Sequence, residues 1–267
     1  MILIAGPCVI DEVKSLYAVA RELKSILKHF PHIDFYFKSS CVKDNRSKLT
    51  DYYGPGFNKG VIILQDIKKE FDFKISTDFH SVEDIKTYSK YVDLIQIPAF
   101  LAKQTSIIRA AAETGLPVHI KKPQFIGPHH ISSIYSKINE INKNATIFIS
   151  DRGTCFGYDY WMFDPRHIRI MRSCATPNVK LLADVTHPNQ FLEDYTYAFE
   201  LGTSAIVSGA DGIFLETHNN VLFSQCAEDT QIPSQNVWEY INAFSIYYNI
   251  AKKMTGPDHV KYRRSED

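Results

Sequence analysis

Short apolar runs alternate with longer, helix-patterned stretches along all 267 residues of the chain. Eight apolar runs are expected to form strands: 2–6, 33–40, 73–80, 93–100, 117–122, 146–153, 179–187 and 211–218. The stretches expected to form helices are 13–30, 59–71, 82–92, 104–115, 130–141, 167–174, 192–209 and 237–254. Repeated βα units of this kind are typical of a parallel sheet covered by helices.

Eight units in a chain of this length predict an α/β fold of one domain, a closed (β/α)₈ TIM barrel over residues 1–267, because such barrels occupy about 250 residues. An open doubly wound sheet is disfavoured, since neither GxGxxG nor GxxxxGK[ST] occurs. No linker or low-complexity segment interrupts the alternation. The last dozen or so residues are expected to be a frayed charged tail.

Composition narrows the class of partner. Lys+Arg and Asp+Glu both number 30, so the chain has no net charge to attract nucleic acid or an anionic membrane, and small-molecule substrates are favoured. The five cysteines are scattered without a CxxC pair, which argues against a disulfide framework and suits a reducing, cytoplasmic location. The short apolar start is expected to be a strand rather than a signal peptide, and no segment is expected to span a membrane.

Polar residues follow almost every predicted strand, where barrel enzymes carry their catalytic groups. They are Cys8, then Lys38 with Ser39 and Ser40, Asp78 with His80, Gln96, Lys121 with Lys122, Asp151 with Arg152, Asp184 with His187, and Glu216 with His218. Burying such groups is costly unless they share a wet or liganded pocket. The pattern therefore predicts a functional site at the mouth of the barrel.

Two chemical groupings stand out within this set. The basic residues Lys38, Lys43, Arg46, Lys121, Lys122 and Arg152 would converge in a barrel, which suits a ligand carrying phosphate and carboxylate groups. A single strand-end lysine is more often a solvated surface residue, so this argument depends on the set. Cys8, His187 and Glu216 together suit Zn²⁺, Fe²⁺ or Mn²⁺, although Cys8 and His187 taken singly are more often structural.

Taken together, the motifs resemble those of the 3-deoxy-D-manno-octulosonate-8-phosphate synthase family, relatives of the 3-deoxy-arabino-heptulosonate-7-phosphate synthases. The matching segments occur in family order: IAGPCVI, FKSSCVKDNRS, YYGPG, STDFH, LIQIPAFLAKQT, IKKPQF, DRGTCFGYD, DVTH and DGIFLETH. The resemblance implies a transferase that condenses phosphoenolpyruvate with D-arabinose 5-phosphate and water, giving 3-deoxy-D-manno-octulosonate 8-phosphate and inorganic phosphate. It further implies a role in KDO and lipopolysaccharide biosynthesis, and a homotetramer or at least a homodimer.

The resemblance also implies roles for individual residues. Those matching the phosphoenolpyruvate-binding motifs are Lys38, Ser40, Lys43, Lys121, Gln124 and Arg152, and those matching the aldose-phosphate site, partly across a subunit boundary, are Asn45, Arg46, Ser47 and Asp78. Lys43, Lys121 and His187 are the expected catalytic residues. Metal-dependent members carry cysteine after the GP dipeptide, so Cys8, His187 and Glu216 are expected to bind a divalent metal, which could be Zn, Fe or Mn.

The chain departs from the family pattern at two places. The fourth metal ligand, an aspartate, would fall at Ala227, and a shifted loop would put Asp229 in its place. The glycine-rich loop that follows DVTH in the family is shortened here. Two alternatives therefore stay open: a related synthase with another acceptor, such as erythrose 4-phosphate or an amino sugar, and a non-catalytic barrel that binds a sugar phosphate.

Overall fold

The computed structural model describes residues 1–190 and 192–254. Its strands are β1 Ile2–Gly6, β2 Asp34–Lys38, β3 Lys74–Asp78, β4 Leu94–Ile97, β5 Val118–Lys122, β6 Ile147–Asp151, β7 Val179–Asp184, β8 Gly212–His218 and β9 Ile232–Pro233. Its α-helices are α1 Val13–Leu27, α2 Phe57–Phe71, α3 Val82–Tyr88, α4 Thr105–Glu113, α5 Ser132–Ile141, α6 Arg166–Cys174, α7 Ala198–Val207 and α8 Val237–Met254. No described helix has the length and apolar character needed to cross a membrane.

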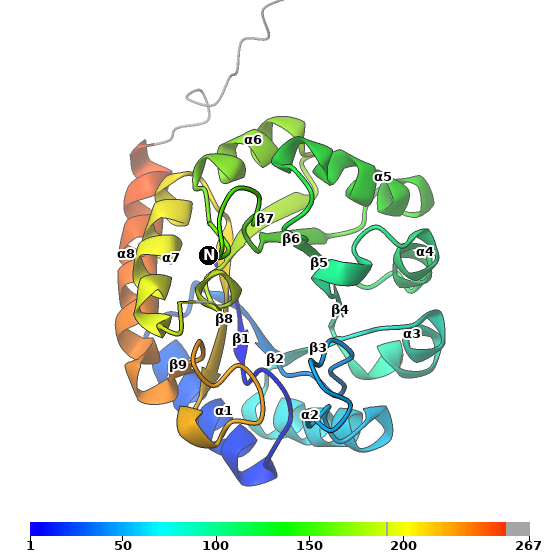
Figure 1. The fold of residues 1–267 in the computed structure, drawn as a ribbon, viewed down its shortest axis with the longest axis vertical. Helices are drawn as coiled ribbons and strands as arrows, with labels where there is room; N and C mark the ends of the chain where they lie inside the picture. The colour runs from blue at the N-terminus through cyan, green and yellow to red at the C-terminus, as the bar shows by residue number, and fades with distance from the viewer. Residues whose placement is uncertain (191, 255–267) are drawn as a thin grey trace, which may run out of the picture.

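Strands β1 to β8 pair in sequence order and in parallel, and β1 also pairs with β8, which closes the sheet into a barrel. Figure 1 looks into this ring of strands, with the helices arranged around its outside. The structure confirms the single-domain (β/α)₈ barrel predicted from the alternation of apolar runs and helical stretches.

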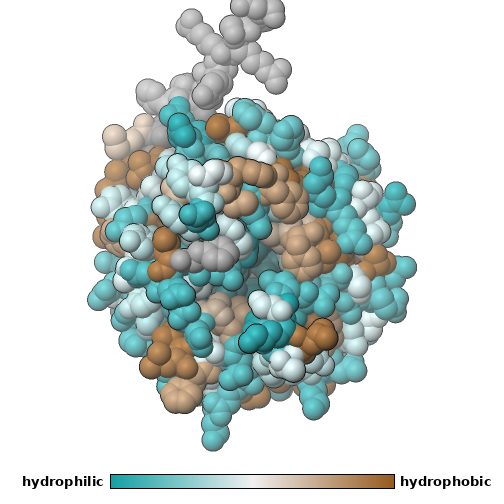
Figure 2. Space-filling view, viewed as in Figure 1, coloured by the Kyte–Doolittle hydropathy of each residue, from teal (hydrophilic) through white to brown (hydrophobic). Residues whose placement is uncertain are grey.

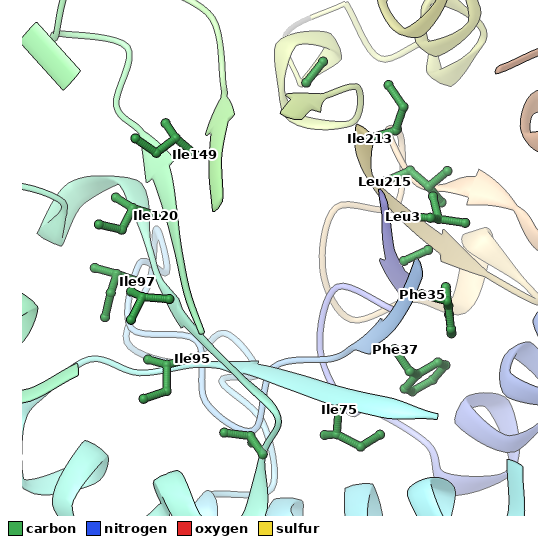
Figure 3. Close-up of a cluster of buried hydrophobic side chains, with 14 of the residues drawn as sticks. Leu3, Phe35, Phe37, Ile75, Ile95, Ile97, Ile120, Ile149, Ile213 and Leu215 are labelled. Carbon is green, nitrogen blue, oxygen red and sulfur yellow. The ribbon is translucent and has the colours of Figure 1, made fainter. Parts of the chain in front are cut away.

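Side chains along each strand alternate between the two faces of the barrel wall. One set faces outward and packs against the helices, as Figure 3 shows for Leu3, Phe37 and Ile120. The other set meets inside the barrel as a separate apolar cluster formed by Ile4, Tyr36, Leu94, Phe148, Leu182 and Phe214. Rings from opposite strands touch there, with 5.6 Å between the centroids of Tyr36 and Phe148.

The same alternation determines where the polar residues lie. Lys38 comes two positions after Tyr36 on β2, Asp184 two after Leu182 on β7, and Glu216 two after Phe214 on β8. Because the side-chain period of a strand is two, these residues face the barrel interior one layer above the apolar cluster. The polar strand ends predicted from the sequence therefore share one face of the fold.

Element boundaries differ from the predicted ones where the chain turns. Residues 192–209 were expected as one helix, but a 3₁₀ turn at Tyr195–Tyr197 precedes α7. The two-residue β9, which pairs with the end of β8, was not predicted because a strand of two residues that includes a proline has no periodic pattern. The expected frayed tail corresponds to residues 255–267, which lie outside the described residues.

Gly6 allows β1 and β2 to approach closely at the level of the polar layer, where its partner on β8 is Glu216. A Cβ at this position would lie 2.2 Å from the carbonyl oxygen of Lys38, and the φ angle is +153°. We expect Gly6→Ala to lower the free energy of unfolding by about 3 kcal/mol. Gly127→Ala is a control, since its Cβ would meet its nearest neighbour, in His130, at 3.6 Å. Urea unfolding of both variants tests this, and equal midpoints would contradict it.

Candidate active site

A cavity of about 440 Å³ opens at the carboxyl ends of the strands, within the size range of small-molecule sites. Figure 2 shows a hollow near the centre of this face, with hydrophilic residues inside it. Ten of the residues to which the family resemblance assigns roles line the cavity: Lys38, Lys43, Asn45, Arg46, Asp78, Lys121, Gln124, Arg152, His187 and Glu216. Four others belong to the described part of the chain but do not line this cavity: Cys8, Ser40, Ser47 and Asp229.

Lys38 is the central cation of the cavity floor. Its ammonium donates hydrogen bonds to Ser40 Oγ at 2.9 Å, to Glu216 Oε1 at 3.3 Å and to the Cys8 carbonyl at 3.2 Å. Asp78 Oδ1 lies 3.7 Å from the same nitrogen. Ser40 was predicted to touch the substrate, but here it contacts Lys38 and Asp78 from beside the cavity.

The two carboxylates beside Lys38 remain ionised although both are buried. Burial by itself would raise the pKa of Asp78, but the charges of Lys38 and Lys43 outweigh it and hold that pKa below the usual range. Burial is likewise outweighed at Glu216, whose pKa is lowered by Lys38, His187 and Lys43. The floor of the cavity is therefore a network of opposite charges.

Lys121 forms a second pair on the other side of the cavity. Its ammonium lies 2.9 Å from Asp184 Oδ2 and 3.3 Å from the centroid of the Phe214 ring. Burial lowers the pKa of Lys121 to about 8, although Asp184 and Glu216 act in the opposite direction. A lysine in this state is a cation at neutral pH that an incoming anion would stabilise further.

His187 is held by the same aspartate. Its Nδ1 lies 3.1 Å from Asp184 Oδ1, and its backbone N–H donates to that oxygen at 3.0 Å. Burial lowers the pKa of His187 to about 4, so the imidazole is neutral at pH 7. With the Nδ1 proton directed to Asp184, Nε2 carries a lone pair and lies 3.9 Å from Glu216 Oε2.

Arg152 forms the wall next to β6 and stacks on an aromatic ring. Its guanidinium carbon lies 3.9 Å from the centroid of the Trp161 ring, and burial lowers the pKa of Arg152 to about 10. Trp161 also lines the cavity and was not selected from the sequence. The aromatic residues that follow the DRG motif are the signal that could have identified it.

Lys122 has a structural position, although the sequence grouped it with the anion-binding residues. Its buried ammonium donates to the carbonyls of Pro123, Ile126 and Gly153 at 3.1–3.2 Å and lies 3.1 Å from Asp151 Oδ1. These contacts join the loop after β5, which carries Gln124, to the residues after β6. Lys122 is therefore a positioning residue.

The residues predicted for the aldose phosphate lie apart from one another. Asn45 and Arg46 line the outer cavity, and Asp78 lies at its floor, whereas Ser47 is exposed on the loop outside the cavity. Arg46 Nη1 donates to Cys226 Sγ at 2.8 Å. Of these four residues, Asn45 and Arg46 are the two that present polar groups at the rim.

The predicted metal ligands occur as separated groups. Across residues 1–190 and 192–254, no three histidine, cysteine, aspartate or glutamate side chains stand together in ligating positions. His187 and Glu216 approach each other, and Cys8 Sγ lies 2.9 Å from Cys226 Sγ. Asp229 is exposed beside a different depression, away from the lining of the main cavity.

An eight-stranded parallel barrel with buried cations and carboxylates at its strand ends is the arrangement of an enzyme that acts on small anions. The model of the DAHP synthetase I family matches residues 1–243, and the chain belongs to this family. It is similar to 2-dehydro-3-deoxyphosphooctonate aldolases. That of Helicobacter hepaticus is 40% identical over 82% of this chain and 86% of the relative. Those of Campylobacter jejuni and Wolinella succinogenes are 35% and 39% identical over 95% and 82% of this chain, covering 98% and 88% of each relative. These matches confirm the resemblance drawn from the motifs.

Lys122→Met is expected to lower the free energy of unfolding by about 3–5 kcal/mol, because it leaves the Asp151 carboxylate and three carbonyls buried without their cation. Lys86→Met, on the exposed side of α3, is the matched control and should change it by less than about 0.5 kcal/mol. Thermal unfolding of both variants measures the difference. A Lys122→Met protein as stable as the control would show that Lys122 does not hold these loops.

Proposed function

We propose that this protein condenses phosphoenolpyruvate with D-arabinose 5-phosphate and water, releasing inorganic phosphate and 3-deoxy-D-manno-octulosonate 8-phosphate. The observation that carries the proposal is the set of buried cations lining the cavity, Lys38, Lys121 and Arg152. The names of the curated relatives support the same reaction.

Phosphoenolpyruvate would bind between the two sides of the cavity. Arg152, held against Trp161, offers a planar pair of donors to a phosphate or carboxylate, and Lys121 offers a charge at the floor. Gln124 adds a neutral donor from the loop that Lys122 holds. Two anionic substrates repel each other, so these cations both orient them and offset the repulsion.

In the reaction, the methylene carbon of phosphoenolpyruvate forms a bond to the aldehyde carbon of the sugar. Water adds to the carbon that bears the phosphate, and the C–O bond to phosphate is then lost. Lys43 lines the same cavity, 3.7 Å from Asp78 Oδ2, and would bind phosphoenolpyruvate on the side that faces the incoming aldose. Asn45 and Arg46 at the rim would hold the sugar's phosphate end.

We further propose a divalent metal site, Zn²⁺, Fe²⁺ or Mn²⁺, that includes Cys8, His187 and Glu216. Two features fit such a group: Glu216 Oε2 is a buried oxygen without a hydrogen-bond partner among the described residues, and His187 Nε2 faces it with a free lone pair. A bound metal would supply Lewis-acid polarisation of the aldehyde or orient the attacking water. Asp184 would fix the imidazole in the orientation needed for ligation.

The proposal extends to a cytoplasmic homotetramer, or at least a homodimer, with small-molecule partners and no nucleic-acid or membrane ligand. All five cysteines are free thiols, which suits a reducing compartment. The subunit assembly rests on the family resemblance.

Phosphate release from phosphoenolpyruvate tests the activity, with arabinose 5-phosphate and erythrose 4-phosphate as rival acceptors. We expect turnover with arabinose 5-phosphate, its loss on chelation, and recovery with a divalent metal. Arg152→Ala should lower kcat/KM by about 100- to 1000-fold, while Arg109→Ala, an exposed arginine on α4, should leave it unchanged. Preference for erythrose 4-phosphate would establish the related synthase, and no release with either sugar would favour the non-catalytic barrel.

The pH dependence follows from Lys121, whose pKa is lowered to about 8. We expect kcat/KM to fall above about pH 8, where free enzyme loses this cation. The free energy of unfolding should rise between about pH 8 and pH 10.4. In this range the unfolded chain still carries the Lys121 proton and the folded chain has lost it, so raising the pH favours folding. A rate that stays constant up to about pH 10 would exclude Lys121 as the titrating group.

A further inference from the structure

We infer that Cys226, rather than Asp229, completes the metal site, so that the ligands are Cys8, Cys226, His187 and Glu216. This inference rests on the metal part of the proposed function. It assigns a ligand to the place where the family pattern leads to Ala227.

The two thiols are brought together from opposite ends of the chain. Cys8 follows β1 and Cys226 lies in the loop between β8 and β9, yet their sulfur atoms are 2.9 Å apart. Cysteine sulfur is a strong ligand for Zn²⁺ and Fe²⁺, and two of them side by side form half of a tetrahedral site.

A buried glutamine holds this pair in place. Gln231 Oε1 accepts from the Cys8 backbone N–H at 3.0 Å, and its amide nitrogen donates to the Cys226 carbonyl at 2.8 Å. The same nitrogen donates to Ser224 Oγ at 2.7 Å. One side chain therefore ties both cysteine backbones together, which is expected of a ligand pair whose geometry matters.

The backbone after Cys226 explains why the neighbouring residues are not ligands. Ala227 has a φ of +54°, and its carbonyl accepts the backbone N–H groups of Thr230 and Gln231, forming a tight turn. This turn leaves Asp229 exposed, while Cys226 faces Cys8. We therefore assign the fourth ligand to Cys226, one position before Ala227, in place of Asp229.

The other two proposed ligands are His187 and Glu216, and Lys38 contacts both Glu216 and Cys8. Lys38 Nζ lies 3.2 Å from the Cys8 carbonyl and 3.3 Å from Glu216 Oε1. Glu216 Oε2, the buried oxygen without a partner among the described residues, lies 3.9 Å from His187 Nε2. A metal would draw the thiol pair and this pair together by side-chain rotation.

Two thiolates and a carboxylate around a divalent ion carry one net negative charge. Arg46 Nη1 contacts Cys226 Sγ at 2.8 Å and Lys38 contacts Glu216, so cations already adjoin both ligand pairs. Arg46 would then link the thiolate to the rim of the cavity where the aldose phosphate is proposed to bind.

Cobalt substitution of the full-length protein tests the inference, under anaerobic conditions with a phosphine reductant. The near-ultraviolet thiolate-to-Co²⁺ charge-transfer band grows with the number of thiolate ligands. We expect one Co²⁺ per chain, and a band that falls to half in both Cys226→Ala and Cys226→Asp. Cys226→Asp should retain Co²⁺ through oxygen, whereas Cys226→Ala should weaken binding by more than about 100-fold, since even losing a ligand's hydrogen-bond partner costs about 10- to 100-fold.

Cys174→Ala, a remote cysteine on α6, and Asp229→Asn serve as matched controls and should keep the full band and affinity. A full band in both Cys226 variants, or loss of affinity in Asp229→Asn, would overturn the inference. Absence of Co²⁺ binding by the unmodified protein would overturn it together with the proposed metal site. A normal two-thiolate band without phosphate release from phosphoenolpyruvate would leave it standing while the proposed synthase activity fails.

Discussion

The ion pairs around Lys38 are the interaction on which the rest of this site depends. An ammonium buried at the floor of a barrel is tolerable because Glu216 and Asp78 lie 3.3 and 3.7 Å away, and those carboxylates are ionised because the ammonium is there. Lys38 lies on β2, Asp78 on β3 and Glu216 on β8. Their distances depend on the register of β2 with β3 and of β8 with β1, which are the two ends of the barrel sequence. Fold and charge network are therefore one cooperative unit.

A second layer of organisation lies in the loops. Lys122 joins the residues after β5 and β6, and Gln231 joins the residue after β1 to the loop after β8. Neither contact involves a cavity-facing atom, yet both determine where cavity-facing side chains lie. The barrel strands determine the direction in which each side chain points. The hydrogen bonds of Lys122 and Gln231 fix the loops that carry some of these side chains.

The barrel and its polar mouth could be predicted because both follow from local periodicity. Apolar runs indicate strands, and a period of two places Lys38, Lys121 and Glu216 on the inner face. The position of Cys226 beside Cys8 could not be predicted, because it depends on the left-handed turn at Ala227 and on Gln231, which leave no periodic signal. The contacts of His119 with Gln96 and Ser150, which join three strands inside the barrel, likewise leave no periodic signal.

An apolar cluster fills the barrel beneath the cavity floor, so molecules cannot pass through the interior at that level. It consists of Ile4, Tyr36, Leu94, Phe148, Leu182 and Phe214. Substrates and products must therefore enter and leave through the mouth of the cavity at the carboxyl ends of the strands. Lys38 and Lys121 line the same cavity as Asn45, so a molecule that reaches the two lysines would enter from this face. The packing of the barrel thus makes the strand-end face the route for both entry and release.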